Sequence, residues 1–264
     1  MKLPATTTLL LERQDDVLTI ILNRPQSRNA MNLIMLEELH ALMAAVGKDP
    51  SLRAIVMRGA GGHFCAGGDI KDMATARSQD RQSQAEINRR FGRLLEDAAR
   101  QPQVLITLLE GAVLGGGLGL AAVSDIAICV EDCRFGLPET SLGVIPAQIA
   151  PFVVQRIGLT HARRLALTAA RFGGKEALRL GLVHYTEVDN AGLESRLGEV
   201  LEQVLRCAPA ANRHTKALLL ATGEQPLQGL LDQAAENFAQ AVTGKEAAEG
   251  TLAFVQKRKP SWAP

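Results

Sequence analysis

The sequence predicts an α/β fold with a helical C-terminal part. The chain has 264 residues, 47% of them hydrophobic, and a formal net charge of +1, so it can bury a large core. Short apolar strands alternate with helical patterns as far as residue 148, and only helical patterns follow. The near-neutral charge and the single Trp and Tyr argue against a nucleic-acid-binding protein, which needs a basic face and usually stacking aromatic residues.

The first elements are predicted from apolar runs and the turns between them. Residues 6–22 hold two β-rich runs around a polar turn, which indicates a hairpin. Asn32 is a favourable helix N-cap and precedes apolar residues at helical spacing as far as Val46. Residues 54–59 predict a strand, a glycine-rich turn covers 59–69, and a helix is predicted over 85–100.

The same order of strand, glycine turn and helix then recurs. A strand is predicted in 104–111, a glycine-rich segment leads into a helix, and a strand follows at 125–130. Helices are predicted at 148–157, 160–168, 175–181, 192–207, 210–221, 227–242 and 245–258. We therefore divide the chain into an α/β core, 1–200, and a helical region, 201–264, whose late position suggests an oligomer surface.

The second glycine segment allows two functional interpretations. Residues 117–122 fit the pattern GxGxxA after a strand, which is typical of a dinucleotide site, although no further βαβ unit follows. No GK[ST] follows either glycine run, so a P-loop is excluded. Two glycine turns that each open a helix could instead direct two backbone N–H groups at one oxygen, forming an oxyanion hole. Close packing of helix on strand is the structural alternative.

Little in the sequence supports a membrane, exported, disulfide-linked or metal-binding protein. The most apolar window, 111–130, contains Asp125 and five glycines, which disfavours a membrane span. No apolar run opens the chain, so we expect a cytoplasmic location. The four cysteines form no CxxC pair and are interpreted as reduced core residues. The five histidines match no metal motif, so we expect no metal.

Four segments in order, 23–32, 64–73, 111–128 and 135–146, resemble the crotonase (enoyl-CoA hydratase/isomerase) superfamily, and 248–260 resembles its last helix. The resemblance implies a spiral core of ββα turns followed by a helical trimerisation region. It implies an acyl-CoA thioester as the ligand, no separate cofactor because coenzyme A is part of the substrate, and a homotrimer or dimer of trimers.

The resemblance also implies which residues act. The N–H groups of Gly68 and Gly116 would hold the thioester oxygen, and Glu139 would be the acid or base beside the α-carbon. Phe254 and Lys257 would reach the coenzyme A of a neighbouring subunit. The full set of implied substrate-binding residues is Arg24, Ala66, Asp69, Ile70, Lys71, Gly119, Phe254 and Lys257.

Two departures from the family pattern bear on the substrate. Gly119 stands where hydratases carry a second glutamate, so hydration of straight-chain enoyl-CoA is in doubt. Residues 145–154, where IPAQIA replaces the usual IPGxGG, resemble bacterial hydratases of isohexenylglutaconyl-CoA and 3-methylglutaconyl-CoA in acyclic terpene or leucine catabolism. We expect Gly119 to leave space for a substrate branch. A Δ3-Δ2 enoyl-CoA isomerase with a single glutamate and a non-catalytic binder remain the alternatives.

Overall fold

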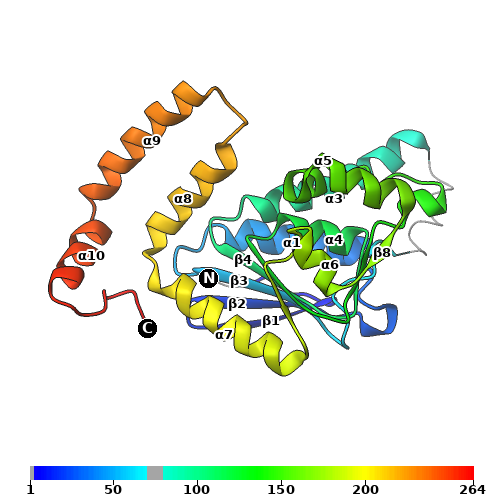
Figure 1. The fold of residues 1–264 in the computed structure, drawn as a ribbon, viewed down its shortest axis with the longest axis horizontal. Helices are drawn as coiled ribbons and strands as arrows, with labels where there is room; N and C mark the ends of the chain where they lie inside the picture. Colours follow the sequence, from blue (N-terminus) through cyan, green and yellow to red (C-terminus); the bar gives the residue numbers. More distant parts are fainter. Residues whose placement is uncertain (1–2, 70–79) are drawn as a thin grey trace.

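The computed structural model describes residues 3–69 and 80–264, and its centre is a six-stranded sheet (Figure 1). The strand order is β1-β2-β3-β4-β6-β9, with β1 antiparallel to β2 and every other pair parallel. The predicted hairpin and the strands predicted at 54–59, 104–111 and 125–130 are confirmed. The strands are β1 (Leu9–Gln14), β2 (Val17–Leu22), β3 (Ala54–Gly59), β4 (Val104–Leu109), β6 (Ile126–Val130) and β9 (Tyr185–Glu187).

A second sheet of three short strands lies beyond the carboxyl end of β4. It is made of β5 (Ala112–Leu114), β7 (Arg134–Gly136) and β8 (Arg171–Phe172). The sequence analysis missed all three and also β9, because runs of two or three residues show no periodicity of their own. Tertiary contacts define them instead, such as the stacking of Phe135 on Phe172 at 5.4 Å.

Helices cover both sides of the main sheet. The helices α1 (Leu33–Val46), α3 (Arg81–Ala99) and α4 (Gly116–Val123) lie on one side, and α7 (Asn190–Arg206) lies on the other (Figure 1). Asn32 caps α1 as predicted, because its side chain accepts a hydrogen bond from the N–H of Met35 at 2.9 Å. Every residue of α4 is buried.

The connecting segments complete the core. Two short 3₁₀ turns, η1 (Pro25–Ser27) and η2 (Glu139–Leu142), flank the region where the glycine turns meet. The predicted break at Gly158 is confirmed, since this residue has a φ of 76° inside α5 (Ala150–Thr168). After β8 the chain forms α6 (Gly174–Arg179) and then reaches β9.

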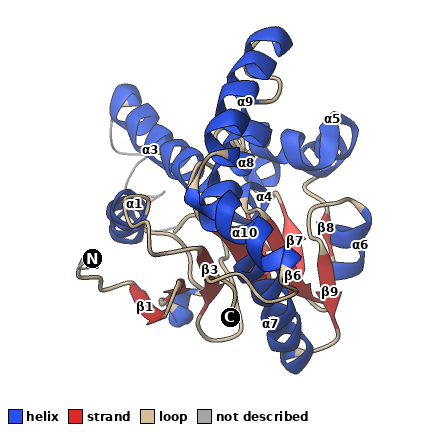
Figure 2. Cartoon of the chain, turned by 90° about the vertical axis from the view of Figure 1, so that its left-hand side faces the viewer, coloured by secondary structure: helices blue, strands red, loops and turns tan. Residues whose placement is uncertain are grey.

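The last three helices form an arm that extends away from the core (Figures 1 and 2). They are α8 (Pro209–Ala221), α9 (Leu227–Val242) and α10 (Lys245–Val255). Because α7 buries Leu193, Val200 and Val204, it belongs to the core, and the arm begins after Arg206 rather than at residue 201. A 2.6 Å ion pair between Lys216 of α8 and Asp125 fastens the arm to the core.

Within the described ranges, each helix is too short or too polar to cross a bilayer. The apolar window 111–130 is divided among β5, the eight-residue α4 and all of β6.

Candidate active site

The turn between β2 and α1 is held by one buried side chain, Asn29. Its φ of 55° is left-handed, a conformation that asparagine adopts more readily than most residues. Its amide oxygen accepts a hydrogen bond from the N–H of Arg24 at 2.8 Å. Its amide nitrogen donates to the carbonyls of Ala60 and His63 at 2.8 and 2.6 Å. One fully buried amide therefore fixes this turn to the segment that follows β3.

The first glycine turn is hydrogen-bonded to that anchored segment around Gly68. Met31 donates to the carbonyl of Gly67 at 2.8 Å and accepts from the N–H of Asp69 at 2.9 Å. In a parallel bridge of this kind, the N–H of the middle residue points away from the partner strand. No acceptor for the N–H of Gly68 is found among the described residues, and Gly68 is exposed. Gly68 therefore presents a free donor.

The second glycine turn presents the other donor at the start of α4. Gly115 has a φ of 49° and donates to Gly136, which leaves Gly116 as the first residue of the helix. A residue at this position has no intrahelical acceptor for its N–H, and none of the described residues accepts from Gly116. Gly68 and Gly116 are thus two unpaired donors, as the family resemblance implies.

The segments that carry the two glycine turns run side by side and pair as neighbouring strands do. Cys65 donates to Ala112 and accepts from Leu114, each at 2.9 Å. Their backbones approach so closely that a Cβ on Gly67 would lie 3.2 Å from the carbonyl oxygen of Leu114. The segments carrying the two free N–H groups are therefore held together by direct hydrogen bonds rather than by intervening side chains.

Glu139 lies over the start of α4. Its Oε1 atom is only 2.8 Å from the point where a Cβ on Gly115 would be, so any other residue at 115 would displace the carboxyl group. Its Oε2 atom is buried and has no hydrogen-bond partner among the described residues. Burial raises the pKa of Glu139, an effect opposed in part by the positive charge of Arg171. A carboxyl group in this state is suited to proton transfer.

The space beside Gly119 is filled. A Cβ at this buried position would lie 3.2 Å from Leu95 and 3.4 Å from Ile149. Two apolar side chains therefore occupy the space next to Gly119, and the expectation that a substrate branch fits beside it stays a prediction. Ile149 lies in the IPAQIA segment where the family usually has glycine, so the sequence shows the larger residue at 149 but not its contact with Gly119.

A further wall of the site comes from α3, which the sequence analysis did not connect with the glycine turns. The ring of Phe91 lies 3.0 Å from the point where a Cβ on Gly116 would be, so it covers the start of α4. Leu95 follows one turn later on the same helix face. No motif indicates Phe91, and only the packing of α3 against α4 could have found it.

The dinucleotide interpretation is wrong. Gly117 packs directly on the first glycine turn, where a Cβ would lie 2.5 Å from the carbonyl oxygen of Cys65. Gly119 faces Leu95 and Ile149 as described above. Both glycines of the GxGxxA pattern therefore serve close packing inside the core.

The other predicted site residues lie in different parts of the structure: some lie near the first glycine turn and others on the arm. Arg24 forms a 2.8 Å ion pair with Asp69, and Ala66 donates its N–H to the carbonyl of Arg28 at 3.0 Å. Phe254 belongs to α10 and Lys257 follows that helix, and Figure 1 shows α10 far from α4 and β8 of the same chain. Ile70 and Lys71 are outside the described residues.

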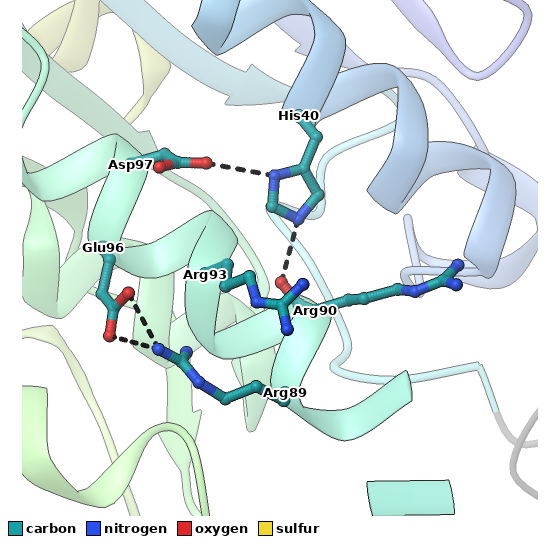
Figure 3. A pocket seen from close by; sticks show the side chains of 6 residues that line it. All are labelled: His40, Arg89, Arg90, Arg93, Glu96 and Asp97. Carbon is teal, nitrogen blue, oxygen red and sulfur yellow. Dashed lines mark hydrogen bonds and ion pairs between the residues drawn. The ribbon is translucent and has the colours of Figure 1, made fainter. Parts of the chain in front are cut away.

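A hollow of about 550 Å³ between α1 and α3 is not part of this site (Figure 3). His40 bridges the helices through Asp97 at 3.1 Å and the carbonyl of Arg90 at 2.9 Å. At 100° per residue, the α3 residues that line the hollow lie opposite Phe91 and Leu95. Those lining residues are Arg89, Arg90, Arg93, Glu96 and Asp97.

A half-buried glutamate over the start of α4, close to backbone N–H groups without acceptors, is an arrangement suited to moving a proton next to a carbonyl while donors stabilise the oxygen. The family model for enoyl-CoA hydratase/isomerase matches residues 12–264, and the chain belongs to this family. It is an enzyme of the enoyl-CoA hydratase type.

Relatives and solved structures resemble nearly the whole chain. The structure of Pseudomonas aeruginosa AtuE is 66% identical, with a TM-score of 0.97, and covers 98% of this chain and 100% of its own. An enoyl-CoA hydratase/isomerase from Marinobacter aquaeolei is 54% identical, with a TM-score of 0.94, and covers 97% and 99%. The 2,3-dehydroadipyl-CoA hydratase of Escherichia coli is 31% identical over 255 residues, which are 96% of this chain and 98% of that protein.

Proposed function

We propose that this enzyme adds water across the 2,3 double bond of a branched enoyl-CoA whose acyl group carries a second carboxylate. Isohexenylglutaconyl-CoA and 3-methylglutaconyl-CoA are the substrates of this class that the sequence favours. The observation that carries the proposal is the buried Oε2 atom of Glu139, which has no partner among the described residues, close to the free N–H groups of Gly68 and Gly116.

In this mechanism the thioester oxygen accepts hydrogen bonds from Gly68 and Gly116. The ionised carboxylate of Glu139 removes a proton from water as the water oxygen bonds to the β-carbon. The electrons of the double bond move toward the thioester oxygen, where fixed N–H groups stabilise the developing charge. The carboxylic acid of Glu139 then delivers the proton to the α-carbon, so that one residue serves as base and as acid.

Two features of the site support a substrate with a second carboxylate. Gly119 supplies no carboxylate of its own, and Leu95 and Ile149 make that wall apolar. Arg171 is exposed and close enough to Glu139 to oppose the rise of its pKa, so it adds positive charge near the site. The Escherichia coli relative is named for a dehydroadipyl substrate, which also carries a carboxylate at the far end of its acyl group.

Isomerisation is the second candidate, because a single glutamate suffices to move one proton between two carbons and the matched family includes isomerases. Mass spectrometry after incubation with defined thioesters separates the candidates. Hydration adds the mass of one water to 3-methylglutaconyl-CoA. Isomerisation of a 3-enoyl-CoA leaves the mass unchanged and shifts the absorbance, and a non-catalytic binder changes neither. Turnover of 3-enoyl-CoA without hydration of any branched ester contradicts the proposal.

We also propose that the enzyme assembles as a homotrimer or a dimer of trimers through the arm. On α9, four exposed apolar residues recur at spacings of four, seven and four positions, which places them within one stripe. These are Leu227, Leu231, Phe238 and Val242, with exposed fractions of 57–69%. Another copy of the chain would cover this stripe and bring Phe254 and Lys257 to a neighbouring site.

A further inference from the structure

We propose that Arg24 is a positioning residue, which fixes the donor of Gly68 through Asp69 rather than binding a phosphate of coenzyme A. This inference rests on the role proposed above for Gly68. It concerns a residue that lies outside the glycine turns and contributes no group to the thioester oxygen.

The guanidinium of Arg24 is already engaged on two sides. Its Nη2 atom lies 2.8 Å from Oδ2 of Asp69, and its Nη1 atom donates to the carbonyl of Ala30. The two charged side chains are only 18% and 11% exposed. A phosphate would have to compete with both contacts, so the geometry favours a structural use of this cation.

The turn around Gly68 is held on both sides of this residue. The backbone bonds from Met31 hold Gly67 and Asp69, and the ion pair adds a third tether at Asp69. Because donors stabilise an oxyanion only at a fixed position, looseness in this turn lowers the rate even when all donors are present.

The ion pair has an electrostatic consequence as well. The carboxylate of Asp69 is adjacent in sequence to the N–H that would receive a developing negative charge. Arg24 neutralises that carboxylate, which would otherwise repel the oxyanion. The planar guanidinium spans Asp69 and Ala30 together, whereas a lysine ammonium is a single point charge.

A comparison of two thioesters tests the proposal. One carries the enoyl group on coenzyme A, and the other carries it on N-acetylcysteamine, which has no phosphate. We expect Arg24→Gln to lower kcat/KM by about 10- to 100-fold for both, with the ratio between them changing less than about threefold. Arg24→Lys should recover part of the loss. A loss confined to the coenzyme A ester, or no loss with either, overturns the proposal.

Two further measurements keep the test independent of folding and of the substrate. In a double-mutant cycle, Arg24→Gln and Asp69→Asn should be strongly non-additive, because both act on the same ion pair. Amide exchange of residues 64–69, followed by mass spectrometry without ligand, should accelerate at least about tenfold in Arg24→Gln. Unchanged exchange overturns the proposal. A wild type that turns over no enoyl thioester contradicts the proposed function instead, and the exchange result still decides the role of Arg24.

Discussion

The helices α4 and α9 show how differently the two parts of this chain use apolar residues. All eight residues of α4 are buried, and its first N–H lies in the candidate site. Of the sixteen residues of α9, only Leu230 is buried, while Phe238 is 69% exposed. The core therefore completes its packing within one chain, whereas the arm keeps an apolar stripe exposed, as expected of a surface that another molecule covers.

We therefore expect the core to determine the chemical step and the arm to determine the assembly. Substitutions around α4 should change the chemical step and leave the assembly intact. Substitutions on α9 should change the assembly first. The following predictions test that separation, from the largest expected effect to the smallest.

Removing the acid/base group should have the largest effect. Glu139→Gln keeps the shape of the side chain but cannot carry the proton, so kcat should fall by about 10²- to 10⁴-fold. Steady-state kinetics together with calorimetric binding of a coenzyme A ester check this, and binding should be nearly unchanged. If more than a third of the activity remains, another residue performs the proton transfer.

Removing one oxyanion donor should have the next largest effect. Gly68→Pro deletes the N–H, and kcat should fall by at least about 10²-fold. Gly68→Ala keeps the N–H and serves as the matched control, and circular dichroism verifies that both variants fold. A folded proline variant with full activity excludes Gly68 from the oxyanion hole.

A larger residue at position 119 tests whether the Ile149 side chain fills the space that a side chain at 119 would need. Gly119→Glu forces a carboxylate against Leu95 and Ile149 and should lower the free energy of unfolding by about 1–3 kcal/mol or more. Adding Ile149→Ala should recover part of that loss and permit weak hydration of crotonyl-CoA. Denaturant titrations and a two-substrate assay measure both effects. If Gly119→Glu alone is as stable and active as wild type, Leu95 and Ile149 do not pack closely against position 119 in solution.

Disrupting the arm should dissociate the assembly with a smaller effect on the chemical step. Phe238→Glu introduces a charge into the apolar stripe, so light scattering should shift toward the 28.3 kDa monomer. We expect KM to rise, because Phe254 and Lys257 would no longer reach a neighbouring ligand, and kcat to change less than about threefold. A wild type that is monomeric at micromolar concentration contradicts the proposed assembly.

The dependence on pH should be the smallest effect. Burial raises the pKa of Glu139, so the acid limb of kcat/KM should lie above the ordinary range of glutamate. A raised pKa in the folded state adds stability at low pH, which is lost as the pH rises through the folded value. Glu139→Gln should therefore gain stability relative to wild type at neutral pH and lose that advantage in acid. Chemical denaturation at several pH values measures the difference.

Much of the fold, and which segments meet at the candidate site, could be predicted from the sequence, for reasons that particular residues make plain. Asn32 and Gly158 act locally, so the start of α1 and the interruption of α5 follow from the chain itself. The motifs around Gly68, Gly116 and Glu139 resemble a known family, and the structure brings the three together. The strand β8 has two residues and exists only because β7 lies beside it.

The parts that could not be predicted depend on contacts between distant segments. The sequence shows that position 119 is glycine, but only the structure shows that Leu95 and Ile149 fill the space. Likewise, the family resemblance implies that Arg24 binds substrate, whereas the structure shows Arg24 in an ion pair with Asp69. Side-chain partners across the fold determine both outcomes.

The packing of Gly119 against Ile149 also constrains how this site could have diverged. A carboxylate introduced at 119 first would meet Leu95 and Ile149 and produce an overpacked, charged interior. A smaller residue introduced at 149 first would leave only a cavity, which proteins tolerate within the limits of their stability. Evolution from a site with Glu139 alone to one with a second carboxylate at 119 should therefore pass through ancestors with a small residue at 149, and the reverse path should do the same. In related sequences, the sizes of the residues at 119 and 149 should vary in opposite directions.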